Sequence, residues 1–301
     1  MQKFAYLIVA NSNFKILDLC LKMIDDPRND IYLLFDLKSK VNQEQICKMK
    51  KKILKSRIFI CEPIVVNWAG YSQIDAVLKL IVAANGADVN YSYIHFFQGS
   101  DMPIKSQNEI CEYFNQNNGS EFVSVEKSRT AMAQRKAWYR HFFCHNRFFR
   151  KNKFVKALNF GFVYVQKILH IRKNLDIDLY QGSALFSITG KCAKYVETQI
   201  PNIRKRFRYS LAADEVFLQS ILMSSPFRDK IMDINLETSS NARLIDRSRP
   251  DGKNSPHIWR KQELDYLLSL PSNYCFARKF DEKVDLEVAQ LLCYSISNEE
   301  I

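Results

Sequence analysis

Two aspartates in this sequence follow apolar runs of strand length, a position that suits ligand binding. Asp101 comes soon after the run Tyr93–Phe97, and Pro103 prevents that strand from continuing. Asp36 directly follows the run Ile31–Phe35. In doubly wound α/β folds, ligands bind in the crevice outside the carboxyl ends of the parallel strands. We therefore expect both aspartates to contact a ligand; the alternative is that each carboxylate only closes its own turn.

The residues after the first apolar run narrow the kind of ligand. Asp36 lies 26 residues after Ala10, which is similar to the acid that binds ribose in dinucleotide-binding folds. However, the sequence has no G-x-G-x-x-G after this run and no Walker motif, so neither a nicotinamide site nor a P-loop is supported. Asn11 and Asn13 instead stand where they can cap the next helix and meet a ligand. This arrangement suits a nucleoside bound through its base and ribose, with the diphosphate bound elsewhere.

The elements that must position these residues alternate along the first 126 residues. Five apolar runs have strand length and β-type composition: Phe4–Ala10, Ile31–Phe35, Ile58–Cys61, Tyr93–Phe97 and Phe122–Val125. Between them, apolar residues recur at helical spacing over Phe14–Ile24, Ile46–Ile53, Ile74–Ile81 and Ile110–Phe114. Ser106 and Glu109 form a capping box before the last of these helices. The alternation predicts an α/β fold with a mostly parallel Rossmann-like sheet and helices on both faces.

Weaker patterns follow in the second half. Helical spacing is expected at Met132–Arg150, Phe154–Ile171, Lys191–Glu197, Ala213–Met223, Gln262–Leu268 and from about Val284. Strands are expected at Ala184–Ile188, Ile231–Ile234, Ala242–Ile245 and within Tyr274–Phe280. No repeat or Pro/Gly linker divides the chain. We expect one domain over residues 1–301, with a nucleotide-binding half (1–126), a basic aromatic helical insert (127–181) and an acceptor and catalytic half (182–301).

The basic charge of the chain is concentrated in that insert. The formal net charge is +12, and the stretch from Lys127 to Leu175 holds thirteen Lys and Arg residues and no acid, so the remainder sums to −1. The same stretch also carries aromatic residues, among them Trp138, Tyr139, Phe142, Phe143, Phe148, Phe149 and Phe154. This combination favours an anionic partner such as lipid headgroups, nucleic acid or an acidic glycan. The alternative is a solvated helical face over an aromatic core.

The eight cysteines and the first apolar run indicate the compartment. The cysteines form no C-x-x-C and no close cluster, as expected of buried thiols in a reducing environment. The run Phe4–Ala10 is too short for a signal-peptide core or a membrane span. We expect a cytoplasmic protein, either free or in peripheral contact with the inner face of the membrane.

Seven segments, taken in order, resemble the core-2/I-branching β-1,6-N-acetylglucosaminyltransferase family (glycosyltransferase family 14), which also includes protein xylosyltransferases. They are AYLIVANSN, IYLLFDLKS, VVNWAGYSQIDA, YIHFFQGSDMPIKS, GSALFSITG, ADEVFLQSIL and FARKFD. The resemblance covers roughly Ala5–Glu126 and Gly182–Leu286, and residues 127–181 do not match. It implies a GT-A fold, a UDP-sugar donor, inversion at the anomeric carbon, and neither a metal ion nor another cofactor.

The resemblance also assigns the base and a diphosphate contact. Glu215 stands at the position of the family's catalytic base, which takes the proton of the acceptor hydroxyl; otherwise an acid there would only complement a helix dipole. Asp214 is then expected to cap the helix. Lys279 matches the lysine that contacts the donor diphosphate. Arg278 departs from the animal pattern and is expected either to add a second contact or to point to solvent. A further arginine on the phosphates stays unplaced among Arg243, Arg247, Arg249, Lys253 and Arg260.

For the nucleoside, Val9, Ala10, Asn11 and Asp36 match the family's contacts to uridine. Trp68 occupies the place of an aromatic residue near the donor, although a lone Trp is more often packed than stacked on a ligand. Asp101 and Ser183 are candidates for sugar hydroxyls, Asp101 on the donor side and Ser183 on the acceptor side.

Two motifs resemble metal sites. Asp176 and Asp178 spell D-x-D, the manganese motif of many GT-A enzymes, but they follow a basic helix instead of a strand end. His141 and His145 have zinc spacing if that stretch is helical, but no third ligand stands near them. We expect no metal at either place.

Two functions remain open. The first is an inverting, metal-independent transferase that moves a sugar from a UDP-sugar to a glycan. We expect the sugar to be N-acetylglucosamine. The acceptor glycan is expected to be lipid-linked, in bacterial surface polysaccharide synthesis, with no nucleic-acid partner. The second is a non-catalytic protein on a degenerate transferase scaffold that binds nucleic acid or another anionic polymer through the basic stretch.

Overall fold

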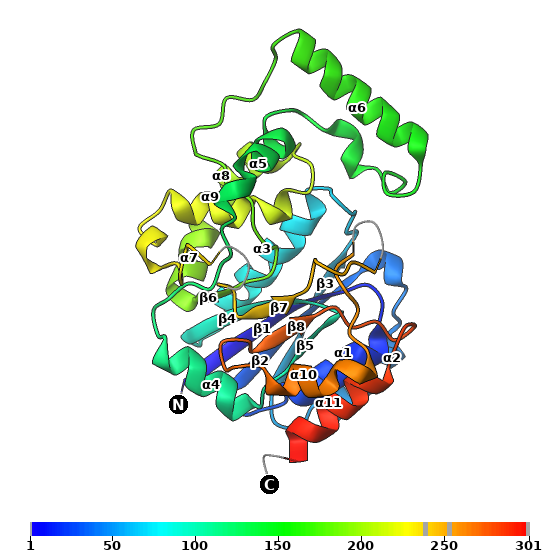
Figure 1. Ribbon diagram of the computed structural model, residues 1–301, viewed down its shortest axis with the longest axis vertical. Coiled ribbons are helices and arrows are strands. Elements are labelled where there is room, and N and C mark those ends of the chain that lie inside the picture. Colours follow the sequence, from blue (N-terminus) through cyan, green and yellow to red (C-terminus); the bar gives the residue numbers. More distant parts are fainter. Residues whose placement is uncertain (1, 237–239, 252–254, 299–301) are drawn as a thin grey trace.

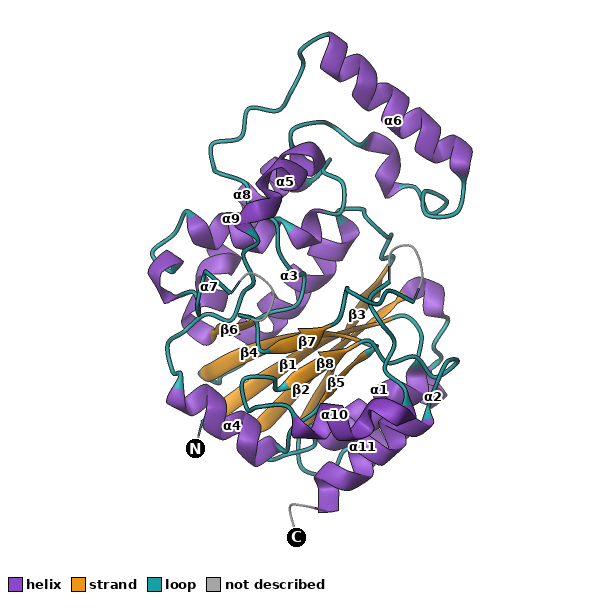
Figure 2. Ribbon diagram, in the orientation of Figure 1, coloured by secondary structure: helices purple, strands orange, loops and turns teal. Residues whose placement is uncertain are grey.

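The computed structural model describes residues 2–236, 240–251 and 255–298, and its centre is a five-stranded sheet (Figures 1 and 2). The strand order is β3-β2-β1-β4-β6. The strands span Lys3–Ala10 (β1), Asn29–Asp36 (β2), Arg57–Ile64 (β3), Tyr91–Gln98 (β4) and Ser187–Thr189 (β6). The first four are parallel and β6 pairs with β4 in the antiparallel sense. The expected mostly parallel α/β sheet is confirmed.

Helices cover both faces of this sheet, because alternate residues of its buried strands point to opposite sides. In β1, Ala5 and Leu7 pack on one face, whereas Tyr6 and Ile8 pack on the other. The first face is covered by α3 (Ser72–Asn85), α7 (Gly190–Thr198), α8 (Ile200–Phe207) and α9 (Phe217–Met223). The second face is covered by α1 (Phe14–Met23), α2 (Gln43–Lys52), α4 (Gln107–Gln116), α10 (Leu264–Ser269) and α11 (Glu287–Asn298).

A second, three-stranded sheet packs on the second face and has the order β5-β8-β7. Its strands are β5 (Asp101–Pro103), β7 (Arg243–Ile245) and β8 (Phe276–Arg278). In β5 and β8, which run antiparallel, Asp101 lies opposite Arg278. Residues that are far apart in the sequence therefore meet directly after the end of β4.

The insert forms a separate layer that lies beyond the helices of the first face (Figure 1). It contains α5 (Thr130–Ala137), a short 3₁₀ turn (Phe142–His145) and α6 (Lys153–Ile168). Cys144 and Phe149 anchor the turn to the body of the protein, where they pack against Ala69. Asn67 strengthens this attachment by donating a hydrogen bond to the backbone oxygen of His145 at 2.7 Å.

Several predicted elements are wrong or shortened. The helix expected at Met132–Arg150 ends at Ala137 and is followed only by the 3₁₀ turn, so His141 and His145 are not on one helix. Phe122–Val125 forms a single bridge from Phe122 to Ser187, and Ile231–Ile234 also contributes only an isolated bridge. The remaining strand and helix predictions are found with shifted ends, and neither β5 nor α8 was predicted. The short elements depend on contacts with distant segments and leave little periodicity in the sequence.

Candidate active site

The loops after β1 and β4 meet the end of β8. Gly99 donates its backbone N–H to the Val9 oxygen at 3.0 Å, and Phe280 donates to the Ser100 oxygen at 2.9 Å. Asn13 begins α1, but its side chain does not cap the helix as expected; Nδ2 instead donates to Ser100 Oγ at 3.0 Å. Gly99 lies close to the backbone of Ala10, since a Cβ added to Gly99 would lie 3.5 Å from the Ala10 Cα. Val9, Ala10 and the exposed Asn11 thus adjoin the segments that hold Asp101, Arg278 and Lys279.

Asp101 and Arg278 bind each other. Arg278 Nη1 donates to Asp101 Oδ1 at 2.6 Å, and the other carboxylate oxygen accepts the backbone N–H of Gln98 at 2.7 Å. Asp101 is buried and Arg278 is mostly buried. Both residues were expected at the donor site, and the structure shows them as an ion pair that joins β5 to β8.

Lys279 is the cation beside this pair. Burial and the charge of Arg278 lower the pKa of its ammonium group, which Asp281, with Oδ2 at 3.8 Å, only partly opposes. Arg150 of the insert is also near enough to lower this pKa. A concentration of positive charge of this kind favours an anionic ligand, because a bound anion would relieve the repulsion between the cations.

Asp36 and Trp68 lie at the ends of β2 and β3. The Asp36 carboxylate accepts the backbone N–H groups of Lys38 and Val66, at 3.0 and 3.2 Å, so it closes its own turn and holds the next loop. Trp68 is 42% exposed, and one face of its ring stacks on Phe149 of the insert with centroids 6.4 Å apart.

Glu215 is held by two side chains from the insert. Its Oε2 accepts hydrogen bonds from Lys136 Nζ at 2.5 Å and from Gln181 Nε2 at 3.0 Å, and Lys136 also donates to Gln181 at 3.1 Å. Oε1 accepts none from the residues that the structure describes. Burial favours the neutral acid, but Lys136, Gln181 and the charge of Arg247 outweigh it, so the pKa of Glu215 lies below its usual value. The lowered pKa keeps the carboxylate charged, and the two hydrogen bonds hold it in place. The side chain is 30% exposed, so a ligand can reach it.

Asp214, next to Glu215, is buried and does not cap a helix. Its Oδ2 accepts a hydrogen bond from Gln73 at 3.0 Å, while Oδ1 has no partner among the described residues. Residues 213–215 form a 3₁₀ turn, and α9 begins two residues later without a side-chain cap, which corrects the expectation that Asp214 caps it. Burial and the neighbouring Glu215 charge raise the pKa of Asp214.

Ser183 lies close to Glu215 in space, because the preceding residue, Gly182, contacts the Glu215 backbone. The Gly182 N–H donates to the Glu215 backbone oxygen at 2.9 Å. The Ser183 N–H donates to Ser124 Oγ at 2.7 Å, and its carbonyl accepts from Gln219 at 2.6 Å. The backbone of Ser183 is thus fixed next to the residue that contacts the Glu215 backbone.

The structure separates the candidates for the unplaced arginine. Arg243 is buried, and its guanidinium binds backbone oxygens such as those of Asn241 and Phe186, at 2.6 and 2.7 Å. Arg249 binds Asp246 and Glu263, Arg260 binds Asp251, and Lys253 lies outside the described residues. Arg247 is exposed, forms no ion pair with a described residue, and is near enough to Glu215 to affect its pKa. Among these candidates, Arg247 is the one whose charge acts on Glu215 and that has no ion-pair partner in the described residues.

Neither motif resembling a metal site gathers further ligands. Asp176 is bound by Arg206, which donates to both carboxylate oxygens at 2.7 and 2.8 Å. His141 Nδ1 lies 2.9 Å from Asn159 Nδ2 and is buried, so its partner is an amide. Within the described ranges, no group of three or more His, Cys, Asp or Glu side chains could hold a metal ion.

The sequence did not single out Lys136 and Gln181. Lys136 is one of thirteen similar cations in its stretch, and Gln181 belongs to no motif. Only their common contact with Glu215 distinguishes them.

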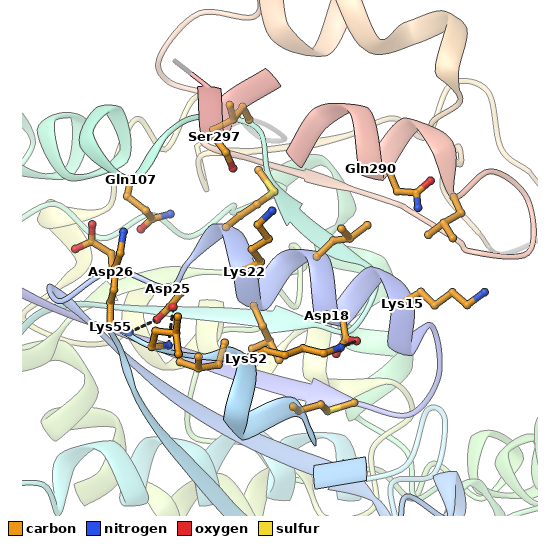
Figure 3. A pocket seen from close by; sticks show the side chains of 18 residues that line it. Lys15, Asp18, Lys22, Asp25, Asp26, Lys52, Lys55, Gln107, Gln290 and Ser297 are labelled. Atoms are coloured by element: carbon orange, nitrogen blue, oxygen red, sulfur yellow. Dashed lines mark hydrogen bonds and ion pairs between the residues drawn. The ribbon is translucent and has the colours of Figure 1, made fainter. Parts of the chain in front are cut away.

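A cavity of about 680 Å³ lies elsewhere, between α1, α2 and α11 (Figure 3). Asp18, Lys22, Lys52 and Gln290 are among its lining residues, and none of the residues discussed for the site takes part. The Asp18–Lys52 ion pair at 2.5 Å crosses from α1 to α2. We assign this cavity no part in the candidate active site.

A family model for the core-2/I-branching enzyme matches residues 4–267. The chain belongs to the core-2/I-branching enzyme family. In the described parts of this family member, no helix combines the length and apolar character needed to cross a membrane.

Two curated relatives show the range of the family. A xylosyltransferase, sqv-6 of Caenorhabditis elegans, is 26% identical over 244 residues, covering 73% of this chain and 27% of the relative. A β-1,3-galactosyl-O-glycosyl-glycoprotein β-1,6-N-acetylglucosaminyltransferase 4 of Danio rerio is 23% identical over 315 residues, covering 96% of this chain and 68% of the relative. The chain thus spans about a quarter of the length of the xylosyltransferase it matches.

Similarity to solved structures is weaker. The glycosyltransferase GlyE of Streptococcus pneumoniae TIGR4 superposes with a TM-score of 0.43 at 9% identity, covering 100% of this chain and 64% of that one. Mouse xyloside xylosyltransferase 1 gives 0.36 at 9% identity, with 92% and 96% covered. Likenesses this distant do not assign a role to any residue.

Proposed function

We propose that this chain is an inverting glycosyltransferase that moves a sugar from a UDP-sugar to a hydroxyl group of a glycan. The observation that carries the proposal is the Glu215 carboxylate, which Lys136 and Gln181 hold through Oε2 while Oε1 is left for an acceptor. Because its pKa is lowered, Glu215 is ionised at neutral pH, as a general base must be.

The chemical step follows from this arrangement. The acceptor oxygen attacks the anomeric carbon and gives its proton to Glu215, while the bond from that carbon to the diphosphate breaks and its electron pair leaves with UDP. Lys279 and Arg247 would neutralise the departing diphosphate, a part that metal ions play in other transferases. Metal independence is accordingly part of the proposal.

Val9, Ala10, Asn11 and Asp36 are proposed to hold the uridine, with Trp68 and Asp101 beside the sugar. Since the Asp101 carboxylate already binds Arg278, we propose that this ion pair shapes the donor site as a unit. Ser183 would face the acceptor beside Glu215. We propose N-acetylglucosamine as the sugar and a lipid-linked bacterial surface glycan as the acceptor, with xylose the second donor to test because of the relatives' names.

The experiment is a thermal-shift and turnover screen of UDP-N-acetylglucosamine and UDP-xylose, with and without EDTA. Glu215→Gln should keep the donor-induced shift and lose transfer by about 10²- to 10⁴-fold. Full activity in this variant, or loss of wild-type activity in EDTA, would contradict the mechanism.

Diphosphate binding has its own matched set of variants. Lys279→Ala and Arg247→Ala should each weaken UDP binding in calorimetry by about tenfold or more. Arg249→Ala is the control, because Asp246 and Glu263 already bind that guanidinium. Equal UDP affinity in all three variants would remove Lys279 and Arg247 from the donor site.

A further inference from the structure

Helix α6 is oriented with its polar stripe inward and its apolar surface outward. Its buried residues are Asn159, Val163 and Gln166, and two of these three are amides. Asn159 pairs with His141 at 2.9 Å, and Gln166 both accepts from the Arg140 N–H at 3.0 Å and donates to the Arg140 oxygen at 2.9 Å. These hydrogen bonds fix the rotation of the helix about its axis, so the outward surface is a defined feature of the fold.

The outward surface is large and apolar. Phe154 is 69% exposed, Tyr164 65% and Ile168 57%. Other exposed apolar side chains on or next to the helix are Phe148, Leu158, Phe160, Phe162, Val165, Leu169 and Ile171. We call these ten residues the apolar face of α6. Figure 1 shows α6 at the edge of the molecule farthest from the central sheet.

Exposed cations, and no acid, occur in the segment that holds this face. Arg147, Arg150, Lys151, Lys153, Lys167 and Arg172 are exposed, and no Asp or Glu occurs between Lys127 and Leu175. At about 100° per residue, Lys153, Lys156 and Lys167 fall along one border of the helix and leave the opposite side apolar. An apolar face with a basic border is typical of helices that lie in the plane of a membrane interface.

We infer that the apolar face of α6 docks on an anionic lipid bilayer, with the helix in the interfacial plane and the surrounding cations on the headgroups. A second copy of the chain is a poorer occupant, because two such surfaces would bring many cations together without an acid. Single-stranded nucleic acid suits the face less well too, since half of its side chains, such as Leu158, Val165 and Ile168, offer no ring for a base to stack on.

Membrane docking would place the proposed active site near the lipid surface. Lys136 of the same insert holds Glu215, Arg150 lies near Lys279, and Phe149 stacks on Trp68. If the proposed transferase activity holds, the acceptor is therefore a glycan attached to a lipid of the same membrane. The docking surface itself does not depend on that activity.

The test is flotation of the full chain with vesicles of phosphatidylcholine alone and of equimolar phosphatidylcholine and phosphatidylglycerol. Wild type should float with the anionic vesicles and less so as salt rises. The triple variant Phe154→Gln, Tyr164→Gln, Ile168→Gln should lose partitioning by about tenfold or more. The control is Leu54→Gln, Val284→Gln, Tyr294→Gln, which changes three exposed apolar side chains outside the insert and should float like wild type.

Circular dichroism and thermal melting check that each variant is folded. Failure of wild type to float with anionic vesicles, or equal flotation of wild type and the α6 variant, would overturn the docking surface. A dimer in light scattering that the α6 variant loses would assign the face to self-association, and single-strand binding lost in that variant would assign it to nucleic acid; either result also overturns the inference. Flotation can also be measured for Glu215→Gln, which should lack transfer activity. Failure of the docking surface is therefore distinguishable from failure of the proposed sugar transfer.

Discussion

Lys136 lies 79 positions before Glu215 in the chain, yet its ammonium group donates a hydrogen bond to the Glu215 carboxylate at 2.5 Å. Gln181, at the other end of the insert, donates to the same oxygen. The basic insert therefore closes over the residue that the resemblance marks as the base. The insert therefore contributes side chains to the candidate active site in addition to carrying the apolar face of α6.

Replacing Lys136 should change the pH dependence of catalysis. In Lys136→Met, burial of Glu215 is no longer offset by the ammonium charge, so the pKa of Glu215 rises. The acid limb of the profile of kcat/KM against pH should move to higher pH, while Lys136→Arg should keep it low. Lys153→Met, an exposed lysine on α6, is the control. An unchanged acid limb in Lys136→Met would show that this lysine does not set the charge of the base.

Breaking the Asp101–Arg278 pair should destabilise the fold. Asp101→Asn leaves a mostly buried guanidinium without its counter-charge, which should lower the free energy of unfolding by about 2–4 kcal/mol in urea denaturation. The double variant Asp101→Asn, Arg278→Met should recover part of that loss. Glu44→Gln, which breaks an exposed pair with Lys48, should leave the midpoint unchanged. Wild-type stability in Asp101→Asn would mean that the carboxylate serves only the ligand.

Gly182 has no room for a side chain. A Cβ there would lie 2.0 Å from the Ser124 backbone oxygen and 2.8 Å from Gln219 Nε2, next to both Ser183 and Glu215. Gly182→Ala should lower the free energy of unfolding by about 3 kcal/mol. Gly161→Ala, on α6 with nothing within 4 Å of the added Cβ, should instead raise it by up to about 1 kcal/mol. Equal denaturation midpoints for the two variants would refute the crowding at Gly182.

Lys173 should make stability depend on alkaline pH. Burial, with the nearby Arg140 charge, lowers its pKa from the usual 10.5 to about 7. As pH falls from 10.5 toward 7, the unfolded chain takes up a proton that the folded chain refuses, so stability falls over that window and this contribution then levels off. Denaturation of wild type and Lys173→Met from pH 7 to 10 should give a flatter curve for the variant. The same slope in both would mean that Lys173 titrates normally in the fold.

The sequence by itself determined the first half of the fold. β1 to β4 and α1 to α4 appear where the apolar runs and helical spacing predicted them, and the Ser106–Glu109 capping box is present. These signals are local, because a buried strand needs a continuous apolar run and an amphipathic helix needs its 3.6-residue period. The position of the basic stretch and, through the seven motifs, the resemblance to the family were also visible in the sequence.

Only the tertiary structure decided which charged residues belong together. Asp101 and Arg278 were both visible as candidates, but their pairing depends on the register of β5 and β8, which lie more than 170 residues apart. The contact between Lys136 and Glu215 likewise depends on how the insert folds back over the body, and the outward apolar face of α6 depends on which side Asn159 and Gln166 anchor. Periodicity shows that a helix has two faces, but which face is buried is set by the partners that distant segments supply.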